Sequence, residues 1–446
     1  MVIRTWLCAC VLAPSIGLAS LGCGTAGVPF ECTADAECTH DGAVGRCEKT
    51  GYCSFPDASC EAGLRYGELA PGELASQCFE PCVLGLALGG QHSCALLRGG
   101  SVACWGNGKD GRLGDGRLDG EATPEPVRVD ASLPASTALA AGGAHTCALA
   151  EDGTVWCWGK NDHRQLGVVG AVVGPLRVTA LDGAGAPAIG LAAGGAHSCA
   201  RASVGTGCWG SNERGQLGRG SVGGDELPAM VDFANAFQEI AAGDAHGCGR
   251  TLAGTVHCWG DNAGLQVGGP DKAVPYPTPL MLQTPARAAS LELGTLHSCM
   301  VSSNEGVECW GNNLLAGQLG RPQAVHDSAT PLHVALPADA TQIAAGATHS
   351  CALDVDGRAW CWGGNEFGQH GPGRAPSTFE PEAVVVELPG GIVEIAAGAF
   401  HTCARTAKDE VYCWGANEAG QLGNGRTDAE GESEPDATVS AKLVCE

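Results

Sequence analysis

Short apolar segments and glycine turns alternate along the chain from about residue 84 to its C-terminal end. One copy of the pattern reads Ile343-Ala-Ala-Gly346, His349-Ser-Cys-Ala-Leu353, Asp356-Gly357 and Cys361-Trp-Gly363. The first piece is short and apolar, as in a buried inner strand. The pieces around the two cysteines flank an Asp-Gly turn signal, which predicts an antiparallel hairpin. The pattern therefore predicts an all-β protein.

The pattern recurs seven times with a nearly constant period. Its histidine marks the copies at His92, His145, His197, His246, His297, His349 and His401. Successive copies are 49 to 53 residues apart, and a repeat of roughly 50 residues that is rich in short strands is typical of a propeller blade. We predict a seven-bladed β-propeller over residues 83–446, preceded by a small disulfide-rich N-terminal segment.

A further strand of the type Pro-x-x-Val follows the glycine-rich loop after each Trp-Gly, as at residues 124–127 and 331–334. The last of these segments, residues 434–439, has no blade after it, and the first blade has none before it. We therefore expect the C-terminal strand to complete the first blade and to remove the open edge of the ring.

Each repeat carries two cysteines on the two sides of its hairpin. Directly opposed residues have Cα atoms about 4.5–5.5 Å apart, a span that a disulfide accepts. The pair at 199 and 208 is one residue closer in sequence, so its hairpin loop should be one residue shorter. Metal binding by the His-x-Cys pieces is the alternative, but Cys-x-x-Cys is absent. The predicted pairs are Cys94–Cys104, Cys147–Cys157, Cys199–Cys208, Cys248–Cys258, Cys299–Cys309, Cys351–Cys361 and Cys403–Cys413.

The recurring Trp-Gly followed by Asn-x-x-Gly-Gln-Leu-Gly, as in residues 209–218 and 414–423, resembles the repeat of the RCC1 (regulator of chromosome condensation) family. The resemblance covers about residues 84–446 and implies an RCC1-type propeller. Gly108 replaces the usual Asn in the first copy, and the fifth copy has two extra residues before Gly317. The paired cysteines distinguish exported bacterial members from the nuclear exchange factor that named the family.

The N-terminus has the pattern of an export signal. Arg4 precedes an apolar run over residues 6–21 that carries no charge and is too short for a stable membrane span. The run ends at Leu21-Gly22-Cys23, which resembles a bacterial lipobox, although Leu21 is one place later than usual. We predict a signal peptide over residues 1–22 and lipidation of Cys23. The protein should then lie at the outer membrane, cell surface or periplasm, with plain secretion as the alternative.

Residues 23–82 form a cysteine-rich leader that is too small for a large core, so disulfides should hold it together. We expect two bridges among Cys32, Cys38, Cys47 and Cys53, whose connectivity stays open because four cysteines allow three pairings. We also expect Cys60–Cys78 and Cys82–Cys445, with Cys78 as the second choice of partner for Cys445. The segment resembles the leaders of myxobacterial surface lipoproteins. A spacer role is the simpler interpretation, and a small binding module is the other.

Composition narrows the choice of function. The 25 cysteines favour an oxidising compartment, and removing Cys8, Cys10 and Cys23 from the set leaves an even number. The net charge of −24 disfavours nucleic acid as a partner. Gly106-Asn-Gly-Lys-Asp-Gly111 matches a dinucleotide motif but lies in the ordinary loop after Trp-Gly. We predict no catalytic residues, cofactor or metal site. We expect the repeated His residues to bond within their own blades, and the repeated Trp residues to form core.

We predict a non-enzymatic cell-envelope lipoprotein, expected to be monomeric, whose propeller binds a protein or a glycan through one face. One alternative is a propeller inhibitor, similar to the secreted RCC1-type inhibitor of β-lactamase. Guanine-nucleotide exchange, which the family name implies, is disfavoured by export. An enzyme or a purely structural envelope role would be further possibilities. The fold by itself does not decide among these functions.

Overall fold

The computed structural model describes residues 82–428, apart from residues 119, 171, 173, 180–185, 235, 285, 304–305, 314–315, 323–325, 373, 375 and 408. It also describes residues 434–439 and short segments between residues 38 and 66. The chain divides into two units, Met1–Glu80 and Pro81–Glu446. Among the described residues, no helix has the length and apolar character needed to cross a membrane.

The N-terminal unit contains short paired strands. β1 (Thr39–His40) pairs with β2 (Ala43–Val44). β4 (Cys53–Pro56) pairs with both β3 (Arg46–Cys47) and β5 (Leu64–Tyr66). Cys38 is disulfide-bonded, whereas Cys23, Cys32, Cys60 and Cys78 lie outside the described residues.

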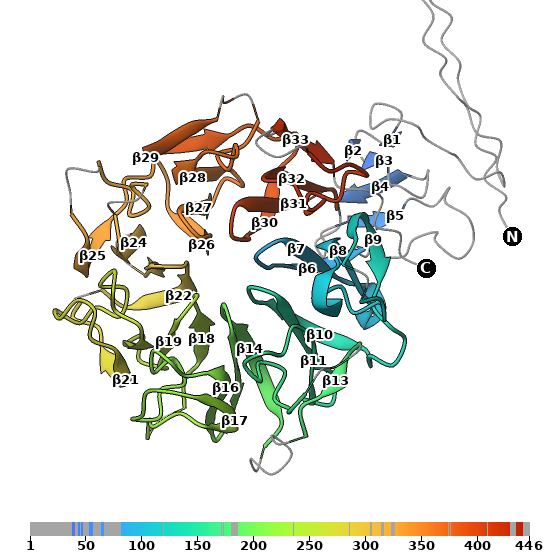
Figure 1. Cartoon of the computed structure of the whole chain (residues 1–446). Coiled ribbons are helices and arrows are strands. Elements are labelled where there is room, and N and C mark those ends of the chain that lie inside the picture. Colours follow the sequence, from blue (N-terminus) through green and yellow to red (C-terminus); the bar gives the residue numbers. More distant parts are fainter. Residues whose placement is uncertain are drawn as a thin grey trace, which may run out of the picture. The chain divides into compact units, whose positions relative to one another are not determined.

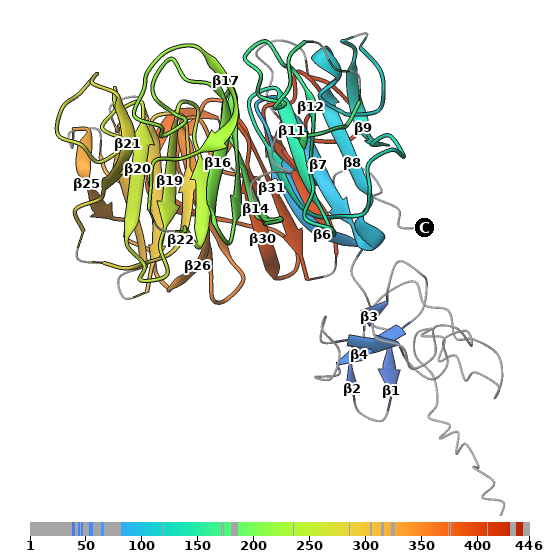
Figure 2. The same cartoon turned by 90° about the horizontal axis from the view of Figure 1, so that it is seen from below.

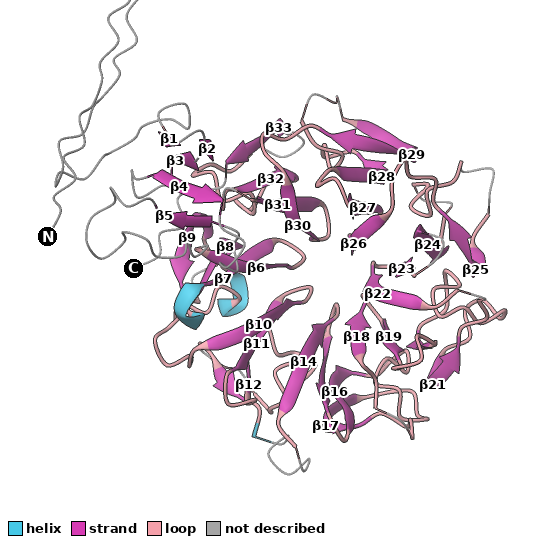
Figure 3. Ribbon diagram, turned by 180° about the vertical axis from the view of Figure 1, so that it is seen from behind, coloured by secondary structure: helices cyan, strands magenta, loops and turns pink. Residues whose placement is uncertain are grey.

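The second unit is the predicted seven-bladed propeller, which confirms the fold class. Figure 1 shows seven four-stranded sheets around a common axis, and Figure 3 shows the same ring from behind. Each blade uses four consecutive strands, from the inner to the outer edge. Figure 2 gives the side view, in which the strands run between the two faces.

The strands fall into four classes by their place in the blade. The innermost are β6 (Val83–Leu88), β10 (Ser136–Ala141), β14 (Ala188–Ala193), β18 (Glu239–Ala242), β22 (Ala288–Leu293), β26 (Ala340–Ala345) and β30 (Ile392–Ala397). The second are β7 (His92–Leu97), β11 (His145–Ala150), β15 (His197–Ala202), β19 (His246–Arg250), β23 (His297–Ser302), β27 (His349–Asp354) and β31 (His401–Thr406).

The third strands carry the repeated Trp and the second cysteine. They are β8 (Val102–Asn107), β12 (Val155–Gly159), β16 (Gly205–Ser211), β20 (Val256–Gly260), β24 (Gly306–Gly311), β28 (Ala359–Asn365) and β32 (Val411–Gly415). The outer strands are β9 (Ala122–Arg128), β13 (Leu176–Arg177), β17 (Asp225–Met230), β21 (Tyr276–Met281), β25 (Ser328–His333), β29 (Ser377–Val386) and β33 (Glu434–Val439). Two 3₁₀ turns, η2 (Arg98–Gly100) and η3 (Lys109–Gly111), lie in the first blade.

The expected closure by the C-terminal strand is wrong. β33 pairs with β32 as the outer strand of the seventh blade, so the first blade is complete without it. Side-chain contacts between the first and seventh blades close the ring instead. The buried Asp409 carboxylate accepts the backbone N–H groups of Cys82, at 2.6 Å, and Val83, at 3.1 Å. Glu394 accepts the N–H of Leu86 at 2.8 Å.

The paired cysteines stand directly opposite each other in every blade, with Cα atoms 4.1 Å apart and the sulfur atoms bonded. The third blade has the expected shorter loop, because Ala202 pairs with Gly205 and leaves two residues between them. In the second blade the loop holds three residues, closed by the Ala150 N–H on the Thr154 carbonyl. Cys82 is also disulfide-bonded, and its predicted partner Cys445 lies outside the described residues.

The hydrophobic core lies between blades as well as within them. One cluster joins Cys94, Leu96 and Leu113 of the first blade to Ala148 and Trp158 of the second. The repeated Trp residues are fully buried in such clusters, as predicted, and burying a large side chain contributes roughly 2–3 kcal/mol. Because each cluster needs two blades, a blade is not stable alone, and the ring is the smallest complete unit.

Candidate functional site

The repeated histidines connect neighbouring blades, so the expectation of bonding within their own blades is wrong. His145 Nε2 lies 2.8 Å from the Ser198 hydroxyl of the next blade. The Ser198 hydroxyl itself donates to the Gln165 carbonyl at 2.9 Å, so His145 must be the donor to it. The same link closes the ring from His401 to Ser93. The bonded pairs are His92–Thr146, His145–Ser198, His246–Ser298, His297–Ser350, His349–Thr402 and His401–Ser93.

The seven repeated histidines form a ring of interblade contacts, the histidine belt, and one contact of this belt is missing. Gly247 occupies the Ser or Thr position of the fourth blade, so neither ring nitrogen of the buried His197 has a hydrogen-bond partner. A Cβ at Gly247 would lie 2.8 Å from the Trp259 indole. The glycine therefore makes room for Trp259, which stacks on Phe237 at 5.7 Å between ring centres. Packing replaces the hydrogen bond at this one interface.

Burial keeps the histidine belt uncharged. Burial lowers the pKa of His145 to about 3, and the neighbouring His197 lowers it further. Burial also lowers the pKa of His297 to about 4 and that of His349 well below its ordinary value. At neutral pH the rings are therefore uncharged, and six of them, all except His197, link to the next blade through Nε2. No surface is left at these residues for a ligand, since all seven are fully buried.

The loop after each Trp-Gly also has a structural role, because its side chains hold the loop and its backbone bonds the next blade. The Asn212 side chain accepts the N–H of Leu217 at 3.2 Å, and the Gln216 side chain accepts the N–H of Arg214 at 2.8 Å. The backbone carbonyl of Gln216 accepts the indole N–H of Trp259 in the next blade. The indole bonds, 2.7–3.0 Å long, are Trp105–Gln421, Trp158–Arg112, Trp209–Gln165, Trp259–Gln216, Trp310–Gln266, Trp362–Gln318 and Trp414–Gln369.

The side chains that the repeat shares are thus buried and serve the fold, although the Nδ1 atoms of the seven histidines have no hydrogen-bond partner among the described residues. The same holds for the dinucleotide-like glycine stretch of the first blade, where η3 (Lys109–Gly111) forms an ordinary turn. A site for a partner must therefore lie where the blades differ from one another. Three such places stand out among the described residues: a histidine in the sixth blade, a groove between the second and third blades, and a carboxylate in the central channel.

The histidine is His370, which occupies a core position. The equivalent residues of the other blades are buried and aliphatic: Leu113, Leu166, Leu217, Val267, Leu319 and Leu422. Neither ring nitrogen of His370 makes a well-formed hydrogen bond. Burial lowers its pKa to about 4, the charge of Arg374 lowers it further, and the nearby Trp362 backbone raises it slightly.

We expect His370→Leu to stabilise the protein by about 1–2 kcal/mol, because it removes a buried polar group without a partner. Chemical denaturation at pH 7.5 measures this gain, and at pH 5 the gain should be larger, since protonation of His370 in the unfolded chain no longer favours unfolding. Leu319→His is the matched control and should destabilise the protein. An unchanged or lowered free energy of unfolding for His370→Leu would contradict this interpretation.

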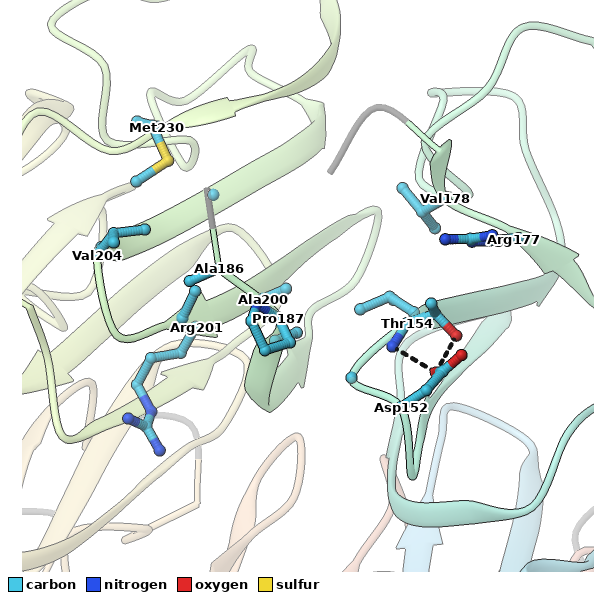
Figure 4. A pocket seen from close by; sticks show the side chains of 16 residues that line it. Asp152, Thr154, Arg177, Val178, Ala186, Pro187, Ala200, Arg201, Val204 and Met230 are labelled. Carbon is cyan, nitrogen blue, oxygen red and sulfur yellow. Dashed lines mark hydrogen bonds between the residues drawn. The ribbon is translucent and has the colours of Figure 1, made fainter. Parts of the chain in front are cut away.

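The groove lies between the second and third blades, on the face that carries their hairpin turns (Figure 4). It has a volume of about 300 Å³. Its floor is aliphatic and buried, with Val155, Val178 and Ala200. Its rim carries Val204, which is 57% exposed, and Met230, which is 45% exposed. The groove lies beside β13, which has two residues, whereas the outer strands of the other blades have six to ten.

Charged groups flank this apolar groove. Asp152 accepts the N–H and the hydroxyl of Thr154, at 2.9 and 2.6 Å. These bonds lower the pKa of Asp152, and the charge of Arg177 lowers it further. Arg201 donates to the Ile189 and Phe237 carbonyls. The result is an apolar slot with fixed charges at its edges, which suits an apolar side chain flanked by polar groups.

Neither this groove nor Glu292 on β22 was predicted from the sequence. Glu292 stands where the other six blades have alanine, and comparison of the seven copies position by position would have revealed it. Within the described part of the chain, no group of three or more His, Cys, Asp or Glu residues could hold a metal ion. The predicted lipidation site, Cys23, is not among the described residues.

Known proteins share this repeat and this fold. A family model described as the RCC1-like domain matches residues 171–444, and models of the regulator of chromosome condensation (RCC1) repeat match residues 83–112, 137–165 and 99–149. The ultraviolet-B receptor UVR8 of Arabidopsis thaliana is 31% identical over 355 residues, which cover 77% of this chain and 79% of UVR8. The human E3 ubiquitin-protein ligase HERC2 is 26% identical over 74% of this chain, but the match spans only 7% of HERC2.

A solved structure extends the likeness of fold. That of Prp20p from Saccharomyces cerevisiae superposes with a TM-score of 0.68 at 23% identity, covering 82% of this chain and 91% of Prp20p. It was described together with the binding properties of Prp20p to Gsp1p and histones. At this identity the likeness shows the fold alone.

Proposed function

The chain belongs to the RCC1-like propeller family, and on this premise we propose that it is a non-enzymatic binding scaffold of the bacterial cell envelope. In this proposal Cys23 carries a lipid, residues 23–82 act as a spacer, and the propeller captures a partner outside the reducing cytosol. The seven cystines support an oxidising compartment.

The observation that carries the proposal is the groove between the second and third blades. An apolar side chain that inserts into a pocket is the usual anchor of a protein interface. The groove offers an aliphatic floor, two exposed apolar side chains at its rim, and a volume sufficient for a single large side chain. None of the described residues that line it is Phe, Tyr or Trp, which favours a protein over a glycan as the partner.

Two other functions fit less well. The structure of Prp20p was described with its binding properties to Gsp1p and histones. For this chain, a net charge of −24 disfavours nucleic acid and nucleic-acid-bound partners, and the proposed export would separate it from cytosolic nucleotide switches. An inhibitor that caps an enzyme would use the same kind of apolar anchor as a scaffold. An inhibitor differs from a scaffold in that its captured partner is an enzyme whose activity falls on binding.

The test is photo-crosslinking in the native bacterial envelope, with benzoylphenylalanine placed at Val204. We expect a discrete crosslinked partner, and at least a tenfold loss of its capture when Met230→Glu is added, because a charge at the rim opposes apolar docking. Leu252, which is 83% exposed at the corresponding hairpin of the fourth blade, is the matched control position. Equal crosslinking from Leu252, or capture that ignores Met230→Glu, would reject the groove.

Mass spectrometry of the same purified protein tests the proposed lipid anchor at Cys23. A diacylglyceryl mass on Cys23 of the mature N-terminal peptide would support the lipoprotein, whereas an unmodified Cys23 would leave a secreted protein.

A further inference from the structure

The seven innermost strands enclose a channel along the axis of the propeller (Figure 1). Its wall at one level is a ring of small side chains contributed by Ala87, Ala140, Ala192, Ala241, Ala344 and Ala396. The seventh member of this ring is Glu292 of β22. A wall that is otherwise alanine thus carries one carboxylate.

Glu292 stands without a partner among the residues that the structure describes. No hydrogen bond or ion pair joins its carboxylate to any residue that the structure describes. The side chain is exposed to the channel, and the surrounding blades enclose it. This enclosure raises the pKa of Glu292 to about 8, and the negative charge of Glu239 raises it further. A carboxylate in such a place lacks a compensating positive charge.

Among the described residues, the rest of the channel lining adds acidic side chains and no basic one. Two connected segments, of about 200 and 180 Å³, share Glu292 as a lining residue, and no Lys, Arg or His lines either of them. Asp244 stands at the glycine-rich mouth, where burial raises its pKa and the charge of Asp261 raises it further. Glu394 and Gln342 also line the channel, but their oxygens accept backbone N–H groups of neighbouring blades.

A negatively charged channel suits a cation, and the residues that line the channel indicate which kind of cation would fit. A metal ion requires several oxygen, nitrogen or sulfur ligands, whereas the residues around Glu292 are alanines and no metal-binding cluster occurs in the described part of the chain. Methyl groups instead suit the methylenes of an alkyl chain. We propose that the channel binds a primary ammonium group on a slender aliphatic chain, with Glu292 as its counter-ion and Asp244 at the entrance.

Two sources share this chemistry: a free aliphatic amine, and a lysine side chain of a partner that reaches into the mouth. This site lies on the axis and does not involve the groove between the second and third blades. The proposal therefore stands or falls separately from the proposed scaffold function.

The test is calorimetric titration of the full mature protein with 1,4-diaminobutane, and with 1,4-butanediol as the uncharged probe. We expect the diamine to bind and the diol not to bind. Glu292→Ala should weaken diamine binding at least tenfold, and it should fold normally because it only makes the ring regular. Glu292→Ala combined with Ala140→Glu, which returns a carboxylate to another point of the ring, should recover most of the affinity.

Two further measurements, the pH dependence of binding and a comparison of peptides, test the proposal. Binding should tighten as the pH rises from 6 to 9, because Glu292 gains its charge over this range while the amine stays protonated. The charged groups around this part of the channel are Asp244 at the mouth, Glu394, which pairs with Arg405, and Glu239 of the neighbouring strand β18, which pairs with Arg250. Because the two arginines compensate Glu394 and Glu239, the negative charge that favours a cation comes from Glu292 and Asp244. A peptide with an exposed Lys, compared with its acetyl-lysine form, tests the lysine source.

Tight binding of the peptide with weak binding of the diamine would assign the site to a partner's lysine, and the reverse would assign it to a free amine. Failure of all cationic probes, or binding that is unchanged in Glu292→Ala, would overturn the proposal.

Discussion

Acidification should unfold this protein well before its carboxylates titrate. The seven buried histidines have folded-state pKa values far below 6.5, in most of them about 3 to 4, because burial opposes their charged form. An unfolded chain therefore binds more protons than the folded one as soon as the pH falls below about 6.5, so stability is lost from there downward. Each histidine contributes at most about 1.4 kcal/mol per pH unit.

Over the seven histidines the loss between pH 7.5 and pH 5 should be on the order of 10 kcal/mol, comparable with the whole stability of a typical domain. Glu292 and Asp244 act in the opposite sense, since their raised pKa values favour the folded state at low pH, but they are outnumbered by the seven repeated histidines together with His370. Denaturation measured at a series of pH values gives the number of protons taken up on unfolding directly from the slope.

We expect that number to approach seven near pH 5.5 and to fall by about one in His145→Gln. An uptake of only one or two protons would mean that the histidine belt is protonated in the folded state, and its neutral donor role would then be wrong.

The repeat made the fold predictable, because one periodic phrase encodes a strand pair, its disulfide and its turn in every blade. The spacing of the cysteines even gave the shorter hairpin at Ala202 and Gly205. The closure was not predictable in the same way. Counting strands suggested a shared first blade, whereas the ring is held by Asp409 and Glu394 on backbone N–H groups of the first blade. Such contacts have no periodic signal, because they occur once.

The same distinction explains the candidate sites. Features that recur seven times, such as His145 and Trp158, were noticed first and belong to the fold. The positions that can serve a partner are exceptions to the repeat, such as Glu292 among alanines and the two-residue strand β13. These positions were not predicted from the sequence, because a departure from a repeat is visible only after the copies are compared column by column.

Reduction of the disulfides should have an effect at least as large as acid. Each blade cystine closes a loop of about ten residues, and loop-closure entropy assigns it roughly 3 kcal/mol. Over seven blades the reduced chain should lose on the order of 10–20 kcal/mol, even if the contributions overlap. We expect the fully reduced mature protein to be unfolded at 25 °C, as judged by near-ultraviolet circular dichroism and by the loss of a cooperative thermal transition.

The kinetics should separate the blade cystines from exposed ones. All fourteen blade cysteines are at most 2% exposed, so a reductant reaches them only when a blade opens, and reduction in native buffer should be slow and accelerate sharply with denaturant. Removing one bridge, with Cys199→Ala and Cys208→Ala together, should cost about 3 kcal/mol and leave the ring folded. If thiol titration of the unreduced, denatured protein finds many free cysteines, or the reduced protein keeps its melting temperature, the stability of the ring rests on interblade packing alone.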